Sequence, residues 1–179
     1  MKEFNIWIEE LRNVRFPTYE ELPTIPLYSD QVIEYINGLL KPFFESNGLL
    51  LTNTMINNYV KQKLMPAPIK KRYTKDHLAY IVTITILKQV ISIPNIVLGI
   101  TRVRNEFSKD EAFNVFIRFV ESAINDVIDQ TEGKSTCLLQ DEKIVDVLIP
   151  MKTACIAFAA KLVAERSLEN ILKQEVKND

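Results

Sequence analysis

The chain has 179 residues, of which 47% are hydrophobic and 25% are charged, and its formal net charge is −1. This is the composition of a soluble globular protein with one sizeable domain or two small ones, and it excludes a disordered or fibrous chain. The four glycines stand apart at positions 38, 48, 99 and 133, so the glycine clusters of a P-loop or a dinucleotide-binding turn are absent.

The first part of the chain predicts two helices joined by a linker. Apolar residues recur at helical spacing over 1–15, which indicates an amphipathic helix packed on the rest of the protein. Three prolines interrupt residues 16–27, which we interpret as the linker. Ser29 or Asp30 is placed to cap the next helix, with Pro42 as a kink or a restart.

A turn, a short helix and a basic connector follow. Asn47 and Gly48 mark the turn, and the short helix runs from Thr52 to about Lys63, where two prolines soon close it. Residues 69–73 are basic and are preceded by proline, so we expect a connector there.

Three helices are predicted between the connector and Gly133, which ends this region. Thr74 is placed to cap the first of them, over 75–90. Residues 82–86 alternate β-branched and hydroxyl side chains as a half-buried strand would, and periodicity alone does not decide between strand and helix. The other two helices run from Ser92 as cap to about Arg104, and over 109–129 behind a capping box of Ser108 and Glu111.

The last part of the chain predicts a long helical stretch in several pieces. It starts at Gln140, is interrupted at Pro150, continues to Glu165 and gives way at Ser167 to a last amphipathic turn or two.

The most apolar segment, 144–163, predicts buried core. Three charges and a proline within it argue against a membrane span. No secretory signal is visible at the start of the chain, because residues 1–15 are charged throughout. We therefore expect a cytoplasmic protein with no membrane partner.

Charge is distributed unevenly along the chain. Residues 46–75 contain no acidic side chain, whereas all 23 acidic residues lie elsewhere. A charge run is usually a solvated face, but the absence of acids creates a local positive field that attracts a polyanion such as nucleic acid. The six basic residues of this segment are Lys61, Lys63, Lys70, Lys71, Arg72 and Lys75.

The helix predicted from Thr52 has a polar and an apolar side. Asparagine can pair bidentately with adenine in the major groove, and a hydroxyl or lysine can take phosphate or guanine. The polar side therefore suits contact with bases, and the alternative is an ordinary solvent-exposed face. The polar positions are Asn53, Thr54, Asn57, Asn58 and Lys61, and the positions assigned to the buried side are Met55, Ile56, Tyr59, Val60 and Leu64.

Motifs between Leu51 and Ile96 occur in a recognisable order: a helix ending in Tyr59 and the turn Lys63-Leu64-Met65-Pro66, a short wing carrying Lys70 to Arg72, Tyr73-Thr74 before a helix, Leu87-Lys88 at its end, and Ser92-Ile93 before the next. This order resembles the DNA-binding domain of MerR-type transcription regulators. The upstream run LPTIPLYSDQVIEYI is similar, more specifically, to a bacterial domain family of unknown function whose front half is MerR-like.

The resemblance implies the fold class. We expect an all-α protein with a MerR-like winged helix-turn-helix domain over 22–104 and a C-terminal helical domain, a bundle, over 105–179. Residues 1–21 form the N-terminal amphipathic helix and linker. The resemblance also makes 80–87 helical. MerR-type regulators usually dimerise through one long helix after the DNA-binding domain, whereas this chain predicts several shorter ones.

The implied function is that of a bacterial transcription regulator that binds double-stranded DNA. MerR-type recognition helices commonly carry arginines and a tyrosine pair, whereas this chain has one tyrosine there, and its wing is short. The alternative is a helical protein-interaction module whose basic face docks an acidic protein and binds no DNA. The expected DNA-binding residues are Thr54, Asn57, Asn58, Tyr59, Lys61 and Lys63 on and after the helix, and Lys70, Lys71 and Arg72 on the wing.

The C-terminal half predicts two further partners. Residues 154–160 are apolar all around a helix, which predicts either a homodimer with an isologous interface or an internal core. A small organic effector bound in this half is compatible with either.

No arrangement of residues indicates an enzyme. The single histidine, His77, is expected at the surface or as a capping residue, and no catalytic partner is evident. Cys155 is expected to be buried, and Cys137 lies in a predicted loop without a base to activate it. Two cysteines and one histidine furnish neither a structural zinc site nor a disulfide framework, so we expect no metal and no cofactor.

Overall fold

The computed structural model describes residues 2–44, 50–134 and 144–178, and over these residues the fold is all-α, as predicted. Two isolated antiparallel bridges are the nearest approach to β-structure there. Asn47, Gly48, Cys137 and Gln140 lie outside the described residues. The helices are α1 (Lys2–Arg12), α2 (Ser29–Phe44), α3 (Asn53–Lys61), α4 (Lys75–Leu87), α5 (Ile93–Arg104), α6 (Lys109–Thr131), a 3₁₀ turn (Asp146–Leu148) and α7 (Ile149–Asn178).

The predicted caps begin three of these helices, α4, α5 and α6, and Thr52, the predicted first residue of α3, is instead its cap. Thr52, Thr74 and Ser92 occupy the cap positions of α3, α4 and α5. Ser108 and Glu111 form the expected capping box of α6, in which the Ser108 N–H donates to Glu111 Oε2 at 2.9 Å. Helix α2 begins at Ser29 itself, so neither Ser29 nor Asp30 is its cap.

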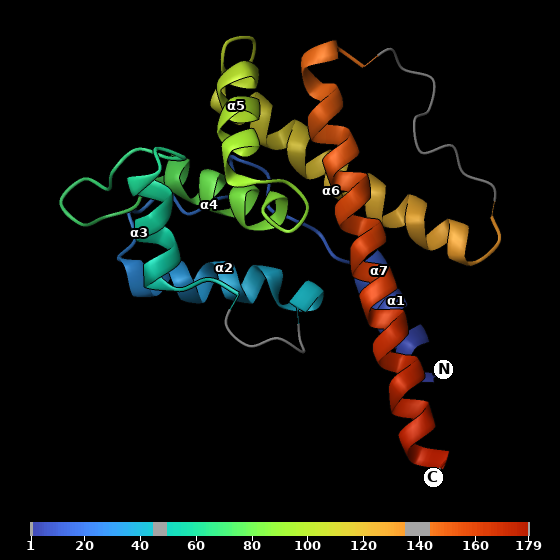
Figure 1. Cartoon of the computed structure of the whole chain (residues 1–179). Helices are drawn as coiled ribbons and strands as arrows, with labels where there is room; N and C mark the ends of the chain where they lie inside the picture. The colour runs from blue at the N-terminus through green and yellow to red at the C-terminus, as the bar shows by residue number, and fades with distance from the viewer. Residues whose placement is uncertain (1, 45–49, 135–143, 179) are drawn as a thin grey trace.

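Helix α4 lies at the centre of the fold, and its burial decides the conflict over 82–86 in favour of a helix. It contacts α2 on one side and α6 and α7 on the other (Figure 1). Nine of its thirteen residues are buried, so its sequence is apolar on nearly every face and carries no clear helical period. The helix ends at Leu87, earlier than the predicted Val90.

One cluster of buried side chains joins the parts of the chain on either side of residue 104. It extends from Trp7 to Val163. Phe158 of α7 lies at 6.0 Å from Phe43 and 6.1 Å from Phe44 of α2, measured between ring centroids. The division into domains at residue 104 stays a prediction, but the two parts share this core.

Helix α1 packs on the body, as its amphipathic pattern predicted. Its Trp7 is buried and donates from Nε1 to the carbonyl oxygen of Pro42 at 3.1 Å. Pro42 lies inside α2, which continues to Phe44, so the helix does not restart there. The Arg166 guanidinium lies 5.5 Å from the centroid of the Trp7 ring, so α7 also holds α1.

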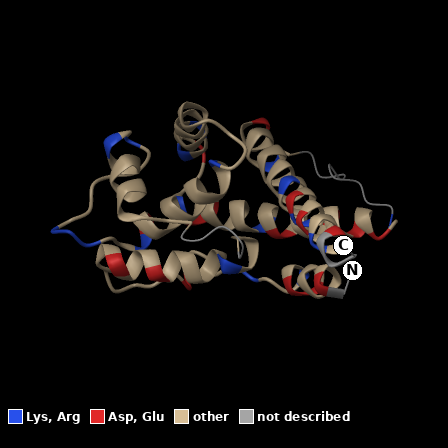
Figure 2. Cartoon of the chain, turned by 60° about the horizontal axis from the view of Figure 1, so that its bottom comes forward, with Lys and Arg blue, Asp and Glu red and all other residues tan. Residues whose placement is uncertain are grey.

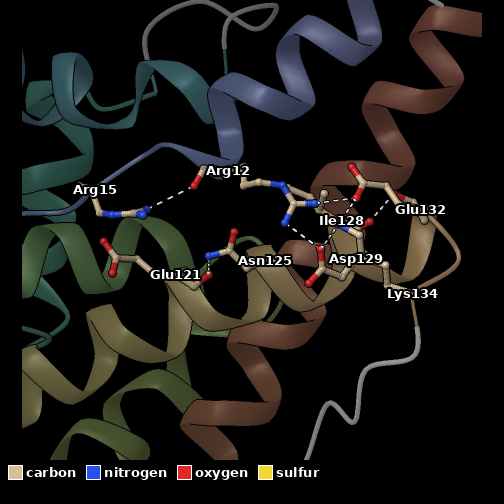
Figure 3. A network of polar contacts seen from close by, with 9 residues as sticks. Arg12, Arg15, Glu121, Asn125, Ile128, Asp129, Glu132 and Lys134 are labelled. Atoms are coloured by element: carbon tan, nitrogen blue, oxygen red, sulfur yellow. Dashed lines mark hydrogen bonds and ion pairs between the residues drawn. The ribbon is translucent and has the colours of Figure 1, made fainter.

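A network of charges fixes the end of α1 to the end of α6 (Figure 3). Arg12 donates to Asp129 at 2.7 Å and to Glu132 at 3.0 Å. The Arg12 hydrogen bond lowers the pKa of Asp129, and the Lys134 hydrogen bond lowers the pKa of Glu132. Because both pKa values are depressed in the folded protein, this network stabilises it fully above the ordinary carboxyl pKa of about 4, and the contribution is lost as the pH falls through the lowered values.

Helix α7 differs from its prediction. Residues 144–145 are not helical, and α7 starts at Ile149, so Pro150 stands in the first turn, where proline leaves no intrahelical hydrogen bond unmade. The helix continues through Ser167 for 30 residues, with Arg166 and Glu169 paired at 3.2 Å across that point. The expectation of several shorter helices in this half was therefore wrong: one long helix follows α6.

By length and composition, the segment 146–175 is the one helix of the described residues that would be able to cross a membrane. Core helices of soluble proteins meet the same criterion. Here Ala154, Cys155, Phe158 and Ala159 are buried in the protein's own core, whereas Ala157 and Ala160 are exposed. Residues 154–160 therefore have one buried face and one free face instead of being buried all around.

Candidate nucleic-acid interface

Helix α3 displays most of the side chains predicted to face DNA. The Met55 N–H donates to Thr52 Oγ1 at 3.3 Å, which fixes the start of the helix. From that start, a period of 3.6 places Ile56 and Tyr59 inward. The predicted contact residues Thr54, Asn57, Asn58 and Lys61 are all exposed.

Tyr59 does not belong to this surface, and its assignment as a DNA-binding residue is corrected. Its side chain is 4% exposed, and the Lys88 ammonium lies 5.8 Å from its ring centroid. The buried hydroxyl has no hydrogen-bond partner among the described residues. Tyr59 packs α3 against the core, as expected from its position three residues after Ile56.

The end of α3 adds Lys63 to the surface through a particular backbone geometry. Lys63 has a φ of 59°. The Leu64 N–H donates to the Tyr59 carbonyl at 2.9 Å and the Lys63 N–H donates to the Val60 carbonyl at 3.0 Å, which together form a Schellman motif. Glycine is the usual residue at this left-handed position, and here a lysine occupies it, with its side chain exposed.

The basic connector contains a tight turn at residues 69–72, which we call the connector turn. Ile69 and Arg72 exchange backbone hydrogen bonds at 3.1 and 2.9 Å. Lys70 and Lys71 between them have φ values of 50° and 62°. A two-residue hairpin turn with both central residues at positive φ normally uses asparagine and glycine. The connector turn therefore projects two adjacent lysines from strained backbone.

Every non-glycine residue with positive φ in the described part of the chain is one of these three lysines. Left-handed conformation costs an L-residue roughly 1 kcal/mol. Strain of this kind persists where the surrounding structure holds it, and it is common at functional sites.

Lys71→Gly is therefore expected to raise the free energy of unfolding by about 1 kcal/mol, because glycine enters the left-handed region without a Cβ clash. Urea denaturation measures this change. Lys61→Gly is the matched control: Lys61 is the exposed last residue of α3 and does not have a positive φ, so glycine should bring no gain in stability there. A loss of stability at Lys71 would contradict the turn geometry.

Two contacts hold the connector turn on the body. Leu27 and Tyr73 exchange backbone hydrogen bonds at 2.9 and 2.8 Å, which joins the residue after Arg72 to the linker before α2. His77 joins both ends of the connector: its Nδ1 accepts from the Thr74 N–H at 3.0 Å, and its Nε2 lies 3.3 Å from the Ala67 carbonyl oxygen. The capping role predicted for His77 is confirmed, but the residue is buried, at 3% exposed, and does not lie at the surface.

The six basic residues of the acid-free segment fall into two groups. Arg72 and Lys75 have partners: Arg72 donates to the Tyr28 hydroxyl at 2.9 Å and lies 4.6 Å from that ring's centroid, and Lys75 donates to the Glu20 carbonyl at 2.9 Å. The side chains of the other four make no hydrogen bond or ion pair with any described residue. These four are Lys61, Lys63, Lys70 and Lys71.

Helix α3 and the connector turn lie together at one end of the molecule, far from the C-terminal end of α7 (Figures 1 and 2). Basic residues mark the tip of the connector and one end of α3, and α3 itself carries no acid (Figure 2). The four lysines with unpartnered side chains are all exposed, two at the end of α3 and two in the connector turn, and Asn57 and Asn58 are exposed on α3.

Tyr28 is a member of this surface that sequence reasoning missed. It is 47% exposed and positions the Arg72 guanidinium by a hydrogen bond and a cation–π contact. The sequence signal for Tyr28 was an aromatic residue directly before a predicted helix. The pairing with a residue 44 positions away had no signal in the sequence.

The described residues contain no group of three histidine, cysteine, aspartate or glutamate side chains that could hold a metal ion. Cys155 is fully buried, as predicted, and burial raises its pKa to about 12. Its thiol therefore stays protonated at neutral pH and is a poor nucleophile.

These features define an all-helical protein with a basic surface, made of a helix and a turn, at one end. The chain belongs to the family described as Domain of unknown function (DUF1836), which matches residues 17–131. The match covers the linker and α2 to α6, so it includes α3 and the connector turn and leaves out α1 and α7. No curated protein and no solved structure matches the chain.

Proposed function

We propose that this protein is a cytoplasmic DNA-binding transcription regulator with a MerR-like winged helix-turn-helix, in which α3 is the recognition helix and the connector turn is the wing. The observation that carries the proposal is the pair of strained lysines at the tip of the connector turn, beside a helix whose outer face holds unpaired amides and lysines. Cations without protein partners suit phosphate, and exposed asparagines suit base edges.

Each residue has a separate role in this proposal. Asn57, Asn58 and Thr54 face the major groove, together with Lys61. Lys63, Lys70 and Lys71 contact phosphates, and Arg72 does so from its platform on Tyr28. The acidic remainder of the protein faces away from the DNA.

Selection of bound duplexes from a random pool tests the proposal directly. An enriched sequence is expected, and at that site Asn58→Ala should cost roughly 1 to 3 kcal/mol of binding while changing the affinity for random duplex little. Asn53→Ala, at an exposed α3 position outside the proposed contact set, is the control. Absence of both enrichment and salt-sensitive binding would favour an acidic protein partner for the same surface.

We further propose that the regulator is a homodimer joined through α7. Since half of 154–160 is used in the protein's own core, the surface left for a partner is the outer face of α7. This face is apolar over several turns and ends in large side chains, of which Leu168 is 61% and Leu172 is 60% exposed. Its residues are Ala157, Ala160, Ala164, Leu168, Ile171 and Leu172.

Light scattering at high micromolar concentration is expected to give the mass of a dimer for the wild type and of a monomer for the double variant Leu168→Glu, Leu172→Glu, because two buried charges would face their copies. Leu98→Glu, at an exposed position of α5 away from this face, should stay dimeric. A monomeric wild type would disprove the dimer without affecting the assignment of the DNA-binding surface.

A further inference from the structure

A cavity of about 100 Å³ lies where α4, α5 and α6 meet the first turn of α7. Its walls are predominantly apolar and it is partly open to solvent. The apolar lining includes Ile96, Val103, Phe113, Phe116 and Met151. The cavity lies between helices of the region matched by the family and the start of α7.

Gly99 keeps part of this cavity open. It lies in the middle of α5 and lines the cavity, and a Cβ at this position would meet no atom within 4 Å. Glycine in a helix interior is destabilising relative to alanine. No neighbouring backbone or side chain approaches closely enough to require glycine there, so the space that its missing side chain leaves belongs to the cavity.

Of the two cations in the lining, Lys109 has an ion-pair partner, whereas Arg104 has none among the described residues. The pKa of the neighbouring Asp110 is lowered by the Ser108 hydrogen bond and, to a smaller extent, by the charge of Arg104. Lys109 is paired with Asp76, which also accepts from the Tyr19 hydroxyl. Arg104 makes one long hydrogen bond, at 3.3 Å to the Phe107 carbonyl, and no ion pair with any described residue. A guanidinium has five donors in a fork that matches a carboxylate, so most of the donors of Arg104 are free.

The N-terminal end of α7 adds to the positive potential of Arg104 in the cavity. Pro150 and Met151 of its first turn form one wall of the cavity. The start of a helix favours a negative charge. Both features favour an anionic group near Arg104, and the predominantly apolar walls favour an apolar body.

We infer that this cavity binds a small monocarboxylic acid with an apolar body, which enters between α4, α5 and α6 and presents its carboxylate to Arg104. An apolar cavity of about 150 Å³ takes up benzene. The present cavity is about a third smaller but partly open to solvent, which leaves room for the ring of a benzoate-sized acid or a short alkyl chain. This inference does not depend on DNA binding.

Titration of the full-length protein with benzoate, followed by NMR of the Ile96 and Met151 methyl groups, tests it. Saturable shifts are expected, with a dissociation constant on the order of a millimolar or lower. Benzylamine, the cationic analogue, should bind at least about tenfold more weakly. Arg104→Gln should weaken benzoate about tenfold and leave the neutral analogue benzyl alcohol unchanged.

Gly99→Leu fills the cavity and is expected to remove most benzoate binding. Gly38→Leu is the matched control, because Gly38 also lies inside a helix with nothing within 4 Å of an added Cβ but does not line the cavity. If Gly99→Leu fails to fold, Gly99→Ala is the replacement, with a smaller loss expected. Absence of saturable shifts in the wild type, equal affinity for the acid and the amine, or unchanged binding in the folded Gly99 variant would each overturn the inference.

Discussion

The affinity of this protein for mixed-sequence duplex DNA is expected to fall about a thousandfold when salt is raised from roughly 50 to 200 mM. If about three of these five basic residues (the four unpartnered lysines together with Arg72) each neutralise a phosphate in every protomer, a dimer engages about six phosphates. Counterion release then gives a slope of log affinity against log salt of about −5. Fluorescence anisotropy of a labelled duplex over this salt range measures the slope.

The double variant Lys70→Glu, Lys71→Glu should weaken binding to all sequences alike and make the salt slope shallower. These two lysines have no protein partner, and glutamate has the same Cβ, so the backbone strain of the turn is retained. Lys41→Glu with Lys173→Glu changes the net charge equally at exposed positions outside the connector and serves as the control. Unchanged binding of the connector variant at low salt would refute the wing assignment and favour the protein-interaction module.

Phe158→Ala is expected to lower the free energy of unfolding by about 3 to 5 kcal/mol. Phe158 of α7 is 1% exposed and packs against the rings of Phe43 and Phe44 of α2. Its removal therefore leaves a cavity that the surrounding helices cannot close. Because the shared core couples both parts of the chain, unfolding should stay a single transition in the variant.

Urea denaturation followed by both circular dichroism and the fluorescence of Trp7, the sole tryptophan, measures this effect. The two probes should give coincident curves. Leu98→Ala, at an exposed α5 position outside the proposed dimer face, is the control and should change stability by no more than about 0.5 kcal/mol. Two separated transitions would show that the parts on either side of residue 104 are independent domains.

The basic surface could be predicted in outline because its signals are local. An acid-free segment, the polar positions of one short helix and a proline-bounded connector are all visible in the sequence, and the exposed residues were placed correctly. The geometry of the connector had no such signal. Lys70 and Lys71 both have positive φ, although such a turn normally uses asparagine and glycine. This geometry is imposed by backbone pairing of Ile69 with Arg72 and of Leu27 with Tyr73.

The sequence by itself determined the starts of α4, α5 and α6, because a serine or threonine cap involves only residues about three apart. The tertiary structure decided which side chains are buried and how far α7 extends. His77, for which a surface position was one of the two expectations, is buried, and its ring lies 3.3 Å from the Ala67 carbonyl oxygen. Helix α7 passes Ser167 because packing of Arg166 on Trp7 and burial of its inner face outweigh a weak local preference against helix.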